Sequence, residues 1–165
     1  MTGAIFVLLF VTASRLFELM LSARHEKALR AQGAVEVGAA HYPAIVALHA
    51  AWLAALWFAG WNATLSYPWL FLFLILQLAR IWTIRSLDER WTTRIIICPG
   101  KPLVARGPYR FVRHPNYMIV AAEIAVLPLA LGLVTYALVF SLANAVLLVL
   151  RITTEDAALR AQRRN

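Results

Sequence analysis

Five apolar stretches, each near the length needed to cross a bilayer, constrain this chain more than any other feature of its sequence. A spanning helix needs about 20 mostly apolar residues. Three stretches of that length lie near 3–22, 43–62 and 67–87, and two shorter ones lie near 117–132 and 135–151. Only 15% of residues are charged, against about 25% in soluble domains. We therefore expect one all-α integral membrane domain over residues 1–165, with five transmembrane helices and the last two as a tight hairpin.

The charges between these stretches predict the orientation of the chain. Loop 61–67 carries no charge, whereas loop 23–42, the connector 88–115 and the tail are basic. Since basic loops lie in the cytoplasm, we expect the N-terminus outside and the C-terminus and connector inside. Residues 23–32 are expected to continue the first helix until a glycine stops it. The first stretch lacks the basic start and the cleavage site of a signal peptide, so we interpret it as a retained span.

Composition also argues against several function classes. The formal net charge of +8 would suggest nucleic-acid binding in a soluble protein, but basic membrane loops account for it and no groove-reading motif is present. A single cysteine, Cys98, excludes an internal disulfide and a cysteine-based zinc cluster. His41 and His49 have no third ligand in register. We therefore expect neither a nucleic-acid partner nor a metal site.

Residues 104–117 combine arginines, aromatic residues, a histidine and two prolines. The Gly-Pro-Tyr sequence at 107–109 is typical of a turn. Pro115 favours the first position of a helix, so the fourth span is expected to begin here, with its free N–H groups and positive dipole end at the membrane surface. This predicts an anion-binding site beside aromatic rings. The alternative is that Arg110 and Arg113 bind lipid headgroups.

Polar residues also stand at the end of the fifth stretch and inside the spans. Arg151 and Glu155 share one helix face, which suits a reaction on an acidic oxygen. The alternative is a surface salt bridge worth at most about 1 kcal/mol. Within the spans, polar residues are expected to face one another. Arg15 is expected to pair with Glu18, and a hydrogen bond is expected across the hairpin between residues 123 and 144.

Several of these motifs, in this order and spacing, resemble the isoprenylcysteine carboxyl methyltransferase family of integral membrane enzymes. They are the Gly-Pro-Tyr turn at 107–109, Arg-His-Pro-Asn-Tyr at 113–117, an apolar hairpin, and Arg151 with Glu155, Asp156 and Leu159. Further matches look like the small bacterial branch that includes alkylpyrone O-methyltransferases; they lie at Gly33-Ala34, Glu36, His41-Tyr42, Gln77, Arg80, Thr92-Thr93-Arg94 and Glu123.

The resemblance implies methyl transfer from S-adenosylmethionine to a carboxylate or acidic hydroxyl of a lipophilic substrate, at the inner membrane of a bacterium. Arg151 would hold the acceptor oxyanion and Glu155 would orient Arg151. Asp156 stands where the family often has a second Glu, and the tail is shorter than in eukaryotic relatives, so we expect an acceptor other than prenyl-cysteine, with an alkylpyrone favoured. The cofactor-binding residues implied are Val104, Gly107, Pro108, Tyr109, Arg110, His114, Pro115 and Tyr117.

Two other functions fit the same residues. The Gly-Pro-Tyr and Arg-His-Pro-Asn-Tyr elements also occur in membrane sterol reductases, so an NADPH-dependent reductase is one alternative. A non-catalytic lipid-binding subunit of the membrane is the other. The expected partners are a lipophilic small molecule and membrane lipid, with no obligate protein partner.

Overall fold

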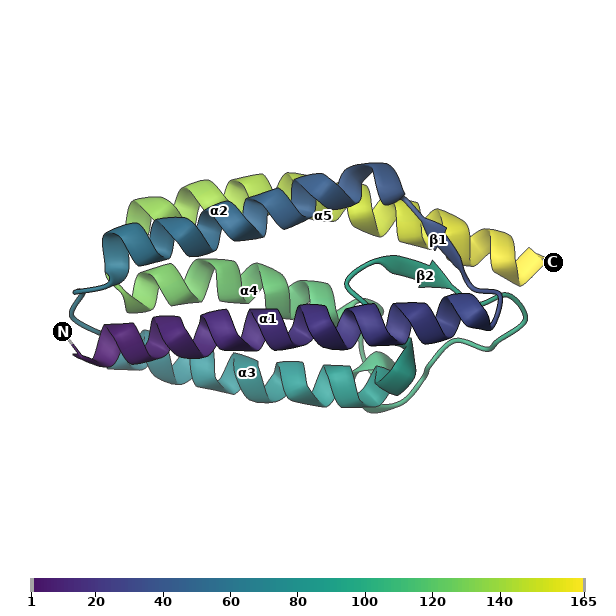
Figure 1. Ribbon diagram of the computed structural model, residues 1–165, viewed down its shortest axis with the longest axis horizontal. Coiled ribbons are helices and arrows are strands. Elements are labelled where there is room, and N and C mark those ends of the chain that lie inside the picture. Colours follow the sequence, from purple (N-terminus) through teal and green to yellow (C-terminus); the bar gives the residue numbers. More distant parts are fainter. Residues whose placement is uncertain (1, 165) are drawn as a thin grey trace.

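Five α-helices and a two-stranded ribbon make up the computed structural model, which describes residues 2–164 (Figure 1). The ribbon pairs β1 (Val35–Val37) with β2 (Ile95–Ile97). Single turns of 3₁₀-helix lie at Ala39–His41, Asp88–Arg90 and Gly107–Arg110. The helices are α1 (Thr2–Ala31), α2 (Tyr42–Gly60), α3 (Tyr67–Leu87), α4 (Pro115–Ala130) and α5 (Val134–Arg164).

The helices run along the long axis of the molecule (Figure 1). α4 packs between α3 and α5, and α2 packs along α5. The ribbon, the segment between α3 and α4, and the C-terminal part of α5 lie together at one end, which we call the connector end. The α2–α3 and α4–α5 turns lie at the opposite end, the turn end. All the basic segments therefore meet at the connector end, as the loop charges predict.

Helix lengths agree with an integral membrane protein. α1, α2, α3 and α5 are each long and apolar enough to cross a membrane, whereas α4 is a shorter apolar helix. The 16 residues of α4 cover about 24 Å, less than the hydrocarbon thickness of about 30 Å. α5 continues well beyond its predicted span, because strong helix formers such as Ala157, Ala158 and Leu159 follow Arg151.

The hydrophobic core occupies the turn-end half of the bundle. Leu8, Trp52, Leu56, Phe73 and Leu127 are almost completely buried there. The α4–α5 turn closes this end through residue Gly132 at φ +72° and a 2.8 Å hydrogen bond from the Leu133 N–H to the Pro128 carbonyl. The predicted tight hairpin is thus confirmed, and its packed end leaves the opposite half of the bundle to hold cavities.

The β1–β2 ribbon ties the α1–α2 loop to the segment after α3. Its strands are antiparallel, with Glu36 opposite Ile96. The Glu36 carboxylate accepts hydrogen bonds from Arg30 and, at 2.6 Å, from Arg94. Partial burial opposes ionisation of Glu36, but these hydrogen bonds outweigh it and lower the pKa of the carboxyl. α1 ends before Gly33, at φ +84°, as predicted; the strand pairing was not predicted from the sequence.

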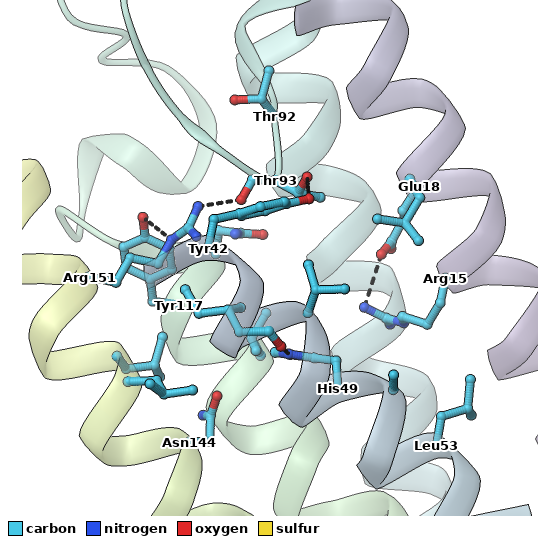
Figure 2. Close-up of a pocket in the computed structure, with 18 of the residues that line it drawn as sticks. Arg15, Glu18, Tyr42, His49, Leu53, Thr92, Thr93, Tyr117, Asn144 and Arg151 are labelled. Carbon is cyan, nitrogen blue, oxygen red and sulfur yellow. Dashed lines mark hydrogen bonds and ion pairs between the residues drawn. The ribbon is translucent and has the colours of Figure 1, made fainter. Parts of the chain in front are cut away.

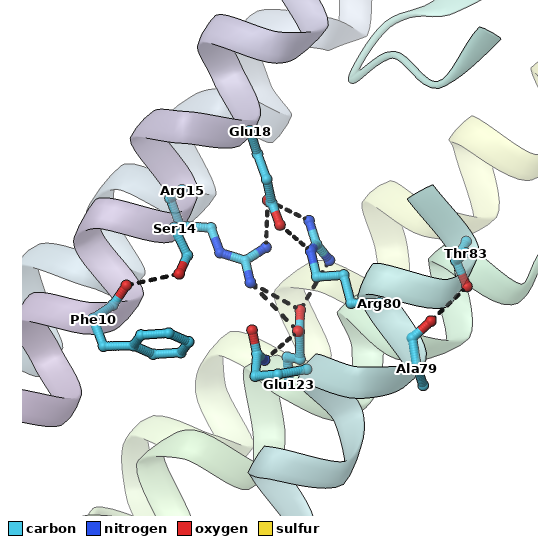
Figure 3. Close-up of polar contacts among 9 residues, drawn as sticks. Phe10, Ser14, Arg15, Glu18, Ala79, Arg80, Thr83 and Glu123 are labelled. Carbon is cyan, nitrogen blue, oxygen red and sulfur yellow. Dashed lines mark hydrogen bonds and ion pairs between the residues drawn. The ribbon is translucent and has the colours of Figure 1, made fainter. Parts of the chain in front are cut away.

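A buried network of two arginines and two glutamates joins α1, α3 and α4 (Figure 3). We call Arg15, Glu18, Arg80 and Glu123 the charge quartet. Arg80 bonds Glu18 through two of its nitrogens and bonds Glu123 at 3.0 Å. Arg15 bonds Glu18 at 3.0 Å and Glu123 at 3.4 Å, and Gln77 donates to Glu123 at 2.6 Å. The charges balance, so four ionised side chains are accommodated inside the bundle.

The charge quartet confirms one prediction and corrects another. Arg15 and Glu18 do pair, as their spacing predicts. The predicted hydrogen bond between Glu123 and Asn144 is wrong, because Glu123 points toward α1 and α3 and is saturated there. Asn144 makes no side-chain hydrogen bond with any residue that the structure describes. Its amide is left facing a cavity.

Candidate functional site

Two cavities of opposite character adjoin in the connector-end half of the molecule. The apolar cavity, of about 300 Å³, lies among α1, α2, α4 and α5 (Figure 2). The polar cavity, of about 90 Å³, lies beneath the segment between α3 and α4 and has room for several water-sized groups. They share a wall whose residues line both spaces: Trp91, Thr92, Asn116, Tyr117 and Arg151.

The start of α4 forms one side of this wall. Pro115 occupies the first turn of α4, where its missing N–H leaves no bond unmade. The Tyr117 N–H bonds the His114 carbonyl at 3.2 Å, and the His114 ring stacks on the Tyr117 ring with centroids 5.4 Å apart. The predicted helix start is therefore confirmed, and it places the histidine and the tyrosine side by side above the cavities.

The end of α5 meets the start of α4 through a chain of hydrogen bonds that we call the site network. The Arg151 Nε donates to the Tyr117 hydroxyl at 2.9 Å, and that hydroxyl donates to Glu155. The His114 Nε2 lies 3.1 Å from an Asp156 oxygen, and its Nδ1 lies 3.7 Å from Glu155. Glu155 therefore connects to Arg151 through the Tyr117 hydroxyl.

The segment before β2 fixes Arg151 from a third side. The guanidinium donates to the Thr93 carbonyl, and the Thr93 hydroxyl contacts the hydroxyls of Tyr42 at 3.0 Å and Ser22 at 2.9 Å. Arg94 lies over the Tyr42 ring, 4.0 Å from its centroid. Arg151 is 6% exposed and its guanidinium is held by oxygens from two elements, so its direction is set before any ligand binds.

Sequence reasoning named ten site residues, and the structure brings half of them to a cavity. Those that line the polar cavity are Tyr109, His114, Tyr117, Arg151 and Glu155. Burial, with the negative charge of Glu155, raises the pKa of the Tyr109 hydroxyl, so this phenol stays protonated. The predicted residues that line neither cavity are Val104, Gly107, Pro108, Arg110 and Pro115.

Gly107 holds the connector against α3 instead. A Cβ at this position would lie 2.0 Å from the Ser86 Oγ, and its φ of +59° favours glycine. The Arg106 Nε donates to the Ser86 carbonyl at 2.7 Å, and Pro108 is buried beside it. The Gly-Pro-Tyr turn therefore positions Tyr109 through packing.

The polar cavity is lined by more cations than anions. Arg90, Arg94, Arg113 and Arg151 face a single carboxylate, Glu155. Two buried polar atoms at the shared wall, the Asn116 Oδ1 and the Trp91 Nε1, lack a hydrogen-bond partner among the described residues. Sequence reasoning missed both, because an unpaired amide or indole leaves no pattern in a sequence. Unpaired buried polar atoms are costly, so the wall is suited to a bound molecule that pairs with them.

Comparison with protein families identifies the chain. Residues 69–161, from the start of α3 into the tail of α5, match the isoprenylcysteine carboxyl methyltransferase (ICMT) family. The chain belongs to this family. The matched region contains the whole site network and both sides of the shared wall.

Two curated relatives come from bacteria. YpbQ of Bacillus subtilis, described as uncharacterized, is 35% identical over 159 residues, which cover 88% of this chain and 90% of the relative. An uncharacterized protein of Haemophilus influenzae is 32% identical over 114 residues, or 66% of each chain. No solved structure matches the chain significantly. Family membership indicates a membrane protein of the S-adenosylmethionine-dependent methyltransferase type and leaves the substrate to be inferred from the site.

Proposed function

We propose that this chain is an integral membrane O-methyltransferase that transfers the methyl group of S-adenosylmethionine to a carboxylate or acidic hydroxyl of a lipophilic acceptor, with an alkylpyrone as the favoured class. The observation that carries the proposal is the shared wall. A polar cavity and an apolar cavity meet at Asn116, Tyr117 and Arg151. A polar end of the donor can occupy the polar cavity and a lipophilic acceptor the apolar cavity, so that the two molecules meet where the cavities adjoin.

The residues of the polar cavity fit the donor that the family uses. The donor carries an amino-acid carboxylate, for which Arg90 and Arg113 supply positive charge. Glu155 and the unpaired Asn116 oxygen can accept hydrogen bonds from its ammonium or hydroxyl groups. When bound, the sulfonium donor supplies an electrophilic methyl group, so an already ionised acceptor needs no strong base.

Arg151 would hold the acceptor oxyanion. It lines both cavities, and contacts to Tyr117 and the Thr93 carbonyl fix its direction. Glu155 acts through the Tyr117 hydroxyl and keeps the cation in place. Holding nucleophile and methyl in line contributes up to about 7–11 kcal/mol in favourable cases. The apolar cavity keeps water away from this point.

The proposed location is the inner membrane of a bacterium, with the connector end facing the cytoplasm. Every basic segment lies at that end, which matches the rule that cytoplasmic loops carry the positive charge. A water-soluble donor would then reach the polar cavity from the cytoplasm, while the acceptor stays in the lipid phase beside the apolar cavity.

The test uses the purified full chain in lipid nanodiscs with methyl-labelled S-adenosylmethionine and a synthetic alkylpyrone or long-chain acid. We expect label in the acceptor with the wild type, and none with His114→Ala or Glu155→Ala. Glu89→Ala is the control. It should retain activity, because Glu89 is an exposed carboxylate that lines neither cavity. Calorimetric titration with S-adenosylmethionine and NADPH separates the alternatives. Binding of NADPH alone would indicate a reductase, and binding of neither would overturn the enzyme assignment.

A further inference from the structure

We propose that the lipid acceptor carries a second oxygen, a hydroxyl or a carbonyl, about 10 Å along its chain from the oxygen that is methylated, and that Asn144 and His49 bind it. This inference rests on the proposed function, since it takes the apolar cavity as the acceptor site. It adds a substrate feature that methyl transfer itself does not require.

The apolar cavity is polar at two depths. At the connector end, Arg151 on α5 and Tyr42 on α2 line it. Seven residues away on the same two helices, Asn144 and His49 line it again. Seven residues make about two helical turns, so each pair shares a helix face and is separated by about 10 Å. α2 and α5 run in opposite directions, so both deeper residues lie toward the turn end, at a similar depth (Figure 2).

On α2 and α5, the wall between these two depths is apolar, while Arg15, Glu18 and Arg80 of the charge quartet line the cavity from α1 and α3. Leu147 and Leu148 on α5, and Ile45 and Val46 on α2, line the cavity between its polar layers. Along α2 and α5, the cavity lining is therefore polar, then apolar, then polar. A chain with oxygens at both positions and hydrocarbon between them matches this order, whereas a plain alkyl tail matches only the first two layers.

Asn144 is the strongest sign that the deeper layer binds something. The residue is 3% exposed and lines the cavity, yet its amide forms no hydrogen bond within residues 2–164. An unpaired amide against hydrocarbon is costly, and a polar group buried in a membrane protein commonly serves binding. Since an amide both donates and accepts, it can pair with a hydroxyl or a carbonyl oxygen.

His49 presents a second hydrogen-bonding atom. Its Nδ1 lies 2.8 Å from the Ile45 carbonyl, which can only accept, so Nδ1 carries the proton. The neutral ring then leaves Nε2 as an acceptor, and no described residue pairs with it. The Nε of Arg15, which also lines the cavity, likewise has no partner in the described chain. The deeper end of the apolar cavity thus holds several polar atoms, from different helices, that lack a hydrogen-bond partner among the described residues.

The test measures binding without methyl transfer. The probes are octadecanoic acid and a series of monohydroxyoctadecanoic acids that differ in the position of the hydroxyl. Each is bound to the full chain in nanodiscs without methyl donor, and binding is followed by native mass spectrometry. The carboxylate of each probe reports on Arg151. We expect the isomer with its hydroxyl about 10 Å from the carboxylate to bind about tenfold more tightly than the unsubstituted acid, the effect of one well-made hydrogen bond. Isomers with the hydroxyl elsewhere should show no gain.

Asn144→Leu should remove this preference and bind the unsubstituted acid at least as well as the wild type does. His49→Phe tests the same layer from α2. Ser141→Ala is the matched control, because it removes another unpaired buried polar atom from α5 that does not line the cavity. A flat isomer profile in the wild type, or an unchanged preference in Asn144→Leu, would overturn the inference and mean that only water occupies the deeper layer. A clear preference without methyl transfer would overturn the proposed function alone.

Discussion

Two buried polar clusters in this bundle, the charge quartet and the site network, are built from similar residues and differ in how completely they are paired. In the quartet, both carboxylates accept several hydrogen bonds and the charges cancel. In the site network, Arg151, Tyr117 and Glu155 form a chain beside two cavities, and the neighbouring Asn116 and Trp91 keep unpaired polar atoms.

The difference separates a structural role from a binding role. The quartet pairs both of its carboxylates with its own arginines, so it fixes α1 against α3 and α4, and the Arg15 Nε is its one buried polar atom without a partner among the described residues. A cluster with unpaired polar atoms at a cavity wall can bind a ligand, but those atoms lower the folding stability of the protein. Removing a quartet member should therefore affect unfolding, and removing a site-network member should affect turnover.

The largest effect is expected from Arg80→Leu, which leaves Glu18 and Glu123 with one arginine between them. Breaking a buried ion pair from one side costs about 3–5 kcal/mol. Denaturant or thermal unfolding in detergent should show this loss. The double variant Arg80→Leu with Glu123→Leu restores charge balance and should recover much of the stability. A double variant as unstable as the single one would contradict this assignment.

The next effect is expected from Arg151→Lys. The guanidinium reaches a phenol oxygen and a backbone carbonyl at once, and a lysine ammonium lacks that fixed geometry. We expect kcat to fall about 10²–10³-fold, as when an oxyanion donor is removed, with an unfolding midpoint close to wild type. Arg160→Lys, an exposed change on the same helix, is the control. Turnover near wild type in Arg151→Lys would show that Arg151 does not take part in the reaction.

A smaller effect is expected from Tyr117→Phe. The ring and its stacking on His114 remain, but the hydroxyl that links Arg151 to Glu155 is lost. We expect kcat to fall about tenfold to a hundredfold, since the cation keeps its Thr93 contact and loses only one of two supports. Steady-state kinetics with the labelled donor measure this, and Tyr136→Phe near the turn end is the control. An unchanged kcat would show that Glu155 does not act through Tyr117.

Much of the architecture could be predicted because it depends on local sequence. Apolar length set the first three spans, Gly33 set the end of α1, and Pro115 set the start of α4. The continuation of α5 was not expected, since charge at Arg151 marks a membrane boundary and carries no information about where a helix stops. The strong helix formers that follow Arg151 determine where α5 ends.

Long-range pairing was harder to predict. The spacing of two helices in a hairpin suggested a bond between Glu123 and Asn144, but α1 and α3 place two arginines around the glutamate. The motifs led to His114, Tyr117, Arg151 and Glu155 because charged and aromatic residues stand out in an apolar chain. The Thr93 carbonyl and the unpaired Asn116 oxygen contribute through backbone position and burial, which no residue pattern reveals.

The smallest effect is expected from Glu36→Gln at the ribbon, where the ion pairs are partly exposed: Arg94 is 32% exposed and Arg30 is 44% exposed. Such pairs contribute about 0–1 kcal/mol and are screened by salt. Because the pKa of Glu36 lies below its ordinary value of 4.5, its contribution is present above that pH and is lost as the pH falls through the lowered pKa. Hydrogen exchange of the β2 amides at falling pH should show this loss in the wild type only. Equal acid sensitivity in Glu36→Gln would show that another group titrates. A loss of stability as large as that of Arg80→Leu would show that exposed and buried charges contribute equally in this bundle.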